Sequence, residues 1–233
     1  MTSITHANTS AHTGDAAADP AAERKRARVA AIALIASPIL WFVGALAFFN
    51  TLGAFYSADD PVAKLNGIAG QRVAWTIQTL LFFAGALCAS VGLILVARLL
   101  RAEAPALAGI GAIAAAAAAM VSAVPVVIRL AAPLDGVRDA SEVPPLLLDV
   151  HAYGTNAPWL GVIPILVTVG AIGLLAVALY LSGKAKWTGA ILVLLCGALL
   201  VSILTGGSPP PVVVYPIAAL LGVRVLFWRT AGS

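Results

Sequence analysis

The sequence predicts an all-α membrane protein, a bundle of six transmembrane helices with both termini in the cytoplasm. Three observations lead to this prediction. Of the 233 residues, 61% are hydrophobic and 10% are charged, against about 45–50% and about 25% in a soluble domain. The apolar residues gather into six runs of about 20 residues, a length that crosses a bilayer as a helix. Lys and Arg residues concentrate between these runs, on alternate sides.

This composition argues against a soluble single-domain enzyme, a disordered protein and a nucleic-acid-binding domain. The net charge of +4 reflects basic residues beside the hydrophobic runs, so it indicates membrane orientation rather than an anionic partner such as nucleic acid. The two cysteines, Cys88 and Cys196, both lie inside apolar runs. They are too few for a disulfide framework or a zinc site.

The predicted elements follow from polarity along the chain. Residues 1–28 lack a periodic apolar face and are predicted to be a disordered cytoplasmic tail. It ends in the basic cluster Arg24, Lys25, Arg26 and Arg28. A transmembrane domain over 29–228 follows, and then a short cytoplasmic tail, 229–233. The predicted spans are 29–49, 73–97, 107–130, 160–181, 188–205 and 212–227. Nothing in them alternates as a membrane strand would.

Orientation follows from the Lys and Arg residues in the segments between spans, which are short enough for the positive-inside rule. With the N-terminus inside, ten of the 14 fall on the cytoplasmic side. The ten are Arg24, Lys25, Arg26, Arg28, Arg98, Arg101, Lys184, Lys186, Arg224 and Arg229, against Lys64, Arg72, Arg129 and Arg138 outside.

The two longer external segments are 50–72 and 131–159. In the first, Asp60 is a predicted N-cap and Pro61 a predicted first helical residue, so we expect a short interfacial helix over 62–68. In the second, Asp149 and His151 form the most notable polar pair. A histidine beside a carboxylate is able to act as an acid/base or hold a metal, but a solvated interfacial loop is the favoured explanation of the pair. These two are the candidate catalytic residues.

The predicted spans contain few polar side chains. Gln78 is the only strongly polar one well inside, and it is the candidate substrate-binding residue, with a hydrogen bond to a neighbouring helix as the plain alternative. Arg129 and Arg224 lie near span ends and are expected to reach the headgroups. Ionisable groups within a bilayer tend to mark ion pathways, so their scarcity argues against an ion-coupled pump.

Two short matches suggest an inverted repeat of three plus three helices, an arrangement found in many transporters. Pro38 and Gly44 align with Pro164 and Gly170, and Gly85 aligns with Gly197. Ala-rich and Leu-rich segments also match by chance. The run 114–119 is all alanine, and such small residues favour close helix packing. Cys88 and Cys196 fall at similar predicted depth, where they would touch if their helices are neighbours.

No phosphate-binding loop, dinucleotide fingerprint or zinc-protease motif is present, so no cofactor and no metal is predicted. The leading hypothesis is a non-enzymatic structural or regulatory module of a bacterial cell inner membrane. Its expected partners are the lipid bilayer and a membrane protein or a second copy, and no nucleic acid. One alternative is a transporter of a lipidic or weakly polar solute. The other is a membrane enzyme or metal site around Asp149 and His151.

Overall fold

A computed structural model describes residues 20–57, 61–130, 158–205 and 211–227 of the chain. Every element in these ranges is a helix, which confirms the all-α prediction. The helices are α1 (Pro20–Ser57), α2 (Pro61–Gly70), α3 (Arg72–Leu100), α4 (Pro105–Leu130), α6 (Pro158–Leu181), α7 (Lys186–Leu204) and α8 (Pro211–Leu226).

Within these ranges, five helices are long and apolar enough to cross a bilayer: α1, α3, α4, α6 and α7. This supports a multi-pass membrane protein. Helix α8 is apolar but has only 16 residues, about 24 Å at 1.5 Å per residue, which is short of a hydrocarbon core of about 30 Å. The predicted sixth span therefore belongs to a shorter helix than the other five.

Helix α1 starts earlier than expected. Residues 20–28 are predicted as part of the disordered tail, and this is wrong because α1 begins at Pro20. Proline is well suited to the first helical position, and Glu23 in the first turn complements the positive end of the helix dipole. Ala27 is 7% exposed within the apolar core. The basic cluster therefore belongs to a packed helix that continues directly into the predicted span.

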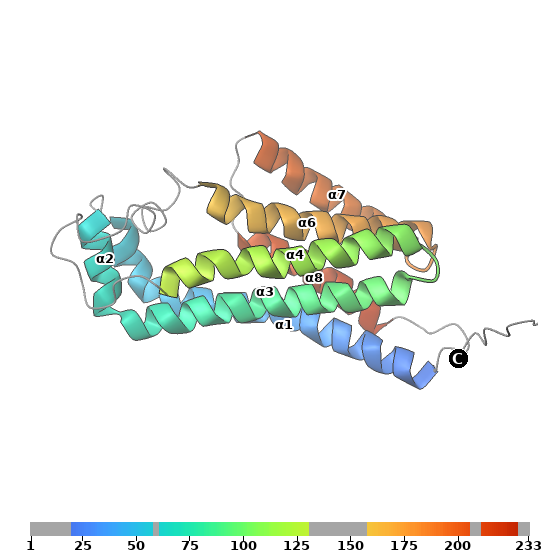
Figure 1. Ribbon diagram of the computed structural model, residues 1–233, viewed down its shortest axis with the longest axis horizontal. Coiled ribbons are helices and arrows are strands. Elements are labelled where there is room, and N and C mark those ends of the chain that lie inside the picture. The colour runs from blue at the N-terminus through green and yellow to red at the C-terminus, as the bar shows by residue number, and fades with distance from the viewer. Residues whose placement is uncertain (1–19, 58–60, 131–157, 206–210, 228–233) are drawn as a thin grey trace, which may run out of the picture.

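Helix α2 is the short helix predicted over 62–68, and Pro61 is its first residue. The chain then turns sharply into α3, where the Gln71 amide donates to the Ile68 carbonyl oxygen at 2.9 Å. Asp60, the predicted N-cap, lies outside the described residues. Figure 1 places α2 at one end of an elongated bundle. This end is called the α2 end below.

Two tight turns lie at the opposite end, called the turn end. Residues 101–104 join α3 to α4, with the Ala104 amide donating to the Leu100 carbonyl oxygen at 2.9 Å. Residues 182–185 join α6 to α7, and Gly183 adopts a φ of +73°, which glycine takes at no steric cost. Figure 1 shows the start of α1 and the end of α8 at this end too. These are the segments that the charge pattern assigns to one side of the membrane.

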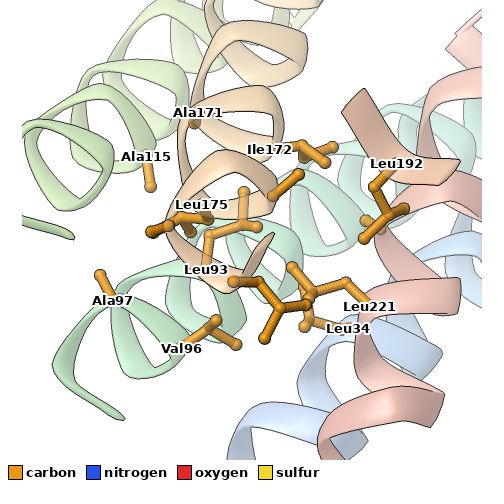
Figure 2. Close-up of a cluster of buried hydrophobic side chains, with 14 of the residues drawn as sticks. Leu34, Leu93, Val96, Ala97, Ala115, Ala171, Ile172, Leu175, Leu192 and Leu221 are labelled. Carbon is orange, nitrogen blue, oxygen red and sulfur yellow. The ribbon is translucent and has the colours of Figure 1, made fainter. Parts of the chain in front are cut away.

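The helices pack in an order that differs from their order in the chain. Helix α1 packs along α3 and α8, α3 along α4, α4 along α6, and α6 along α7. Buried apolar side chains from six helices meet at the centre, as Figure 2 shows. Leu34 of α1 lies between two glycines, since a Cβ atom added at Gly92 or Gly222 would fall within 2.7 Å of it. Glycine at these contacts lets α3 and α8 approach α1 closely.

Candidate functional site

The most prominent polar side chain in the bundle interior belongs to Arg129, in the last turn of α4. Arg129 is only 9% exposed, and its guanidinium carbon lies 4.3 Å from the centre of the Trp75 ring and 5.8 Å from that of Phe82. The Trp75 indole N–H donates to the Arg129 carbonyl oxygen at 3.0 Å. The expectation that Arg129 reaches outward to the headgroups is wrong. The aromatic faces and the negative end of the α4 dipole stabilise its charge inside the bundle.

Gln78 lies on the same face of α3, between Trp75 and Phe82. It is 2% exposed, and its Oε1 atom has no hydrogen-bond partner among the described residues. A buried amide oxygen without a partner costs free energy. In this structure Gln78 is closed off from solvent, and its Oε1 accepts no hydrogen bond from a neighbouring helix among these residues. Neither a substrate contact nor a helix contact is thus established for it.

An aromatic stack extends from this region across the bundle. Trp41 of α1 stacks on Phe82 of α3, with ring centres 3.9 Å apart, and on Tyr215 of α8, with centres 4.7 Å apart. Together with Arg129 and Trp75, these rings tie α1, α3, α4 and α8 together near the α2 end. Sequence reasoning missed this cluster. Its signal was the placement of four scarce aromatic residues within the predicted spans.

A second polar network lies at the turn end. Lys184 Nζ is 2.6 Å from Glu103 Oε1, which joins the two turns. The Arg224 guanidinium donates to the Lys184 carbonyl oxygen at 3.0 Å and so attaches the end of α8 to the same turn. Arg224 was expected to reach the headgroups, but it makes this internal contact instead. The network joins three segments that are far apart in the sequence.

The candidate catalytic pair cannot be placed, because Asp149 and His151 lie outside the described residues. Within the ranges that are described, His, Cys, Asp and Glu residues form no group of three able to hold a metal ion. Cys88 and Cys196 are both free thiols. Cys196 faces α6, where its Cβ lies 3.7 Å from the position that a Cβ of Gly173 would occupy.

The glycines of the suggested repeat have different surroundings in the two halves. A Cβ added at Gly85 would lie 2.6 Å from Trp41 Cδ1, and one at Gly44 would lie 2.9 Å from Phe82 Cε1. These two glycines therefore form the close contact of α1 with α3. A Cβ added at Gly170 or Gly197, their counterparts in α6 and α7, would meet nothing within 4 Å. The sequence match is thus accompanied by a packed helix pair in one half and open glycine positions in the other.

Helices α6 and α7 diverge along their length. At Gly189, near the start of α7, an added Cβ would lie 2.7 Å from the Tyr180 backbone nitrogen, so the helices touch there. Towards the end of α7, Val201 and Leu204 are 60% and 81% exposed, while Leu199, Leu200 and Ile203 are packed against the apolar core. Figure 1 shows the end of α7 pointing away from α6. Gly170 and Gly197 lie further along the helix pair than Gly189, close to the looser contact of Cys196 with Gly173.

Comparisons with known proteins add nothing to this geometry. No protein-family model, curated protein or solved structure matches the chain. The function has to be argued from the bundle itself.

Proposed function

We propose that this chain is a multi-pass protein of a bacterial cell inner membrane, with six spans and both termini in the cytoplasm. It acts as a non-enzymatic structural or regulatory module, through contacts with a partner membrane protein or a second copy of itself. The single observation that carries this proposal is that Gly170 of α6 and Gly197 of α7 are both open positions, where an added Cβ would meet nothing within 4 Å.

Association of helices in lipid depends on close packing. Lipid tails are as apolar as Leu, so helices pair through close packing at small residues rather than through burial of apolar surface. In α1 and α3 the corresponding glycines, Gly44 and Gly85, are already covered within the chain. In α6 and α7 the Cβ positions of Gly170 and Gly197 are open, so a partner helix is able to approach them closely.

The test is site-specific photo-crosslinking in native membranes, with the photoreactive residue at position 170 or 197. We expect a protein adduct of defined mass from both positions, and a mass near twice 23.6 kDa identifies a second copy. Position 113 is the control, because Ile113 on α4 is 72% exposed and is expected to react with lipid alone. Lipid adducts alone at positions 170 and 197 would refute the proposal.

A matched pair of variants separates association from folding. Gly197→Ile places a bulky side chain where an added Cβ meets nothing within 4 Å, so the single chain folds normally while the adduct is lost. Gly109→Ile is the control, since Gly109 on α4 is equally open but lies outside the proposed contact. Its crosslinks from position 170 should be unchanged.

A further inference from the structure

Six exposed basic side chains lie at the turn end, where α1 begins and α3 finishes. Besides Arg24, five of them form the surface called the basic end surface here: Lys25, Arg26, Arg28, Arg98 and Arg101. Figure 1 shows the start of α1 and the end of α3 at this same end of the bundle. The first three residues lie in the part of α1 that sequence reasoning had placed in a disordered tail. Because that part is helical, their positions relative to α3 are defined.

The contact of α1 with α3 places the basic residues of α1 and those at the end of α3 at a similar position along the helix axes. A Cβ added at Gly92 would lie 3.2 Å from the Ala30 carbonyl oxygen, so these residues are level in two antiparallel helices. Arg98 lies six residues beyond Gly92, about 9 Å along the axis, and Lys25 lies five residues before Ala30, about 8 Å in the same direction. Arg28 and Arg101 lie on either side of this level.

The outward side of α1 changes from apolar to basic within one turn. Its inward side is formed by Ala27, Ala30, Ala31 and Leu34, all at most 7% exposed. On the outward side, Ile32 and Val29 are 64% and 45% exposed, and Arg28 and Lys25 follow at helical spacing. Helix α3 repeats the change, from Val91 at 48% exposure to the exposed Arg98. An apolar strip that ends in cations complements an acyl chain that ends in a phosphate.

Among the described residues, few acidic groups offset the positive charge of this surface. Glu23 and Glu103 are the only acidic residues in the described ranges. Glu103 is bound by Lys184 at 2.6 Å, which leaves Glu23 as the acid closest in sequence to the basic residues of α1. Among the described residues, Glu23 is thus the one acidic residue besides Glu103 that is available to offset the five cations.

We propose that the basic end surface binds the headgroups of anionic phospholipids in the leaflet next to it, with their acyl chains along Val29, Ile32 and Val91. The adjoining apolar strip favours a lipid over an acidic soluble protein, because a soluble protein has no acyl chain to pack on these apolar side chains. Clusters of Lys and Arg next to a membrane helix attract anionic lipids electrostatically. The inference requires only that the chain spans a bilayer and is independent of the proposed partner contact.

The test uses the full chain in phosphatidylcholine bilayers that contain a minor fraction of phosphatidylglycerol. The ratio of bound phosphatidylglycerol to bound phosphatidylcholine is measured with spin-labelled lipids. The wild type should prefer phosphatidylglycerol. A triple variant removes three of the charges: Arg28→Gln, Arg98→Gln, Arg101→Gln. Each removed charge should lower the ratio of bound phosphatidylglycerol to bound phosphatidylcholine by up to about fivefold. The three together should lower this ratio by more than about tenfold.

Two controls identify the cause of the loss. The triple variant Arg28→Lys, Arg98→Lys, Arg101→Lys keeps the charges and should keep the preference. In the wild type, raising the salt concentration should weaken the preference through screening, a measurement that needs no variant to fold. The proposal is overturned if the wild type shows no preference, if the Gln variant retains it, or if an acidic peptide competes for the surface better than phosphatidylglycerol does.

Discussion

Arg129 and Trp75 make two separate contacts with each other. The guanidinium carbon lies 4.3 Å from the centre of the indole ring, and the indole N–H donates to the Arg129 carbonyl oxygen at 3.0 Å. The side chain of one residue thus covers the ring of the other, while that ring holds the backbone at the end of α4. The first turn of α3 is joined in this way to the last turn of α4, at the end of the bundle opposite their connecting turn.

Replacement of this tryptophan should destabilise the bundle. Trp75→Leu removes the cation–aromatic contact and the hydrogen bond and leaves the Arg129 charge poorly compensated. We expect a loss of roughly 2–4 kcal/mol in the free energy of unfolding, measured by denaturant unfolding in detergent micelles. Trp187→Leu on α7 is the control, because Trp187 is 85% exposed. Equal losses in both variants would contradict a stabilising role for the Arg129–Trp75 contact.

The contact of α6 with α7 should tolerate no side chain at Gly189. A Cβ there would lie 2.7 Å from the Tyr180 nitrogen and 2.8 Å from the Ala176 carbonyl oxygen, and backbone atoms cannot turn away as a side chain does. Gly189→Ala should therefore cost about 1–3 kcal/mol of stability despite the better helix propensity of alanine. Thermal unfolding measures the effect. Gly109→Ala meets nothing within 4 Å and should be neutral or stabilising.

The ion pair of Lys184 with Glu103 should contribute little to stability. Both side chains are 28% exposed, so water and salt screen the attraction. A double-mutant cycle with Glu103→Gln and Lys184→Met should give a coupling energy below about 1 kcal/mol, smaller at high salt than at low salt. A coupling of several kcal/mol, insensitive to salt, would mean that the pair is shielded from water in the membrane-embedded protein.

The proposed orientation is testable by cysteine labelling in a variant that lacks Cys88 and Cys196. A cysteine at the exposed position 102, in the α3–α4 turn, or 186, at the start of α7, should react with an impermeant maleimide only after the membrane is permeabilised. A cysteine at the exposed position 63 in α2 should react in intact cells. Labelling at position 186 in intact cells would contradict the assignment of the turn end to the cytoplasm.

The existence and type of the elements followed from local pattern. Apolar runs longer than about 18 residues are necessarily helical in lipid, because a helix satisfies its own backbone hydrogen bonds. Asp60 and Pro61 together predicted the start of α2, whose residues 61–70 are helical. The start of α1 at Pro20 was missed because polar and basic residues dominate 20–28, and only the burial of Ala27 against the bundle reveals why that segment is held.

The candidate site shows where local pattern fails. Arg129 was interpreted as reaching outward because its position at a span end permits that, but the choice between headgroup and interior depends on Trp75, 54 residues away in the chain. Gln78 was recognised as polar and inside, but only the folded chain shows that it is 2% exposed with an Oε1 that has no partner among the described residues. Identical glycine motifs gave Gly85 a packed position and Gly197 an open one.

By itself, then, the sequence determined the helical class, the membrane as solvent and the approximate length of each apolar run, since these depend on the hydrophobicity of consecutive residues. Only the tertiary structure decided which helices touch, which face of each is covered and that Arg129 is buried over Trp75. Those outcomes depend on contacts between residues that are distant in the chain. In a bundle of Ala, Leu, Val and Gly, the pairing of helices depends on a few close contacts such as Leu34 with Gly92 and Gly222.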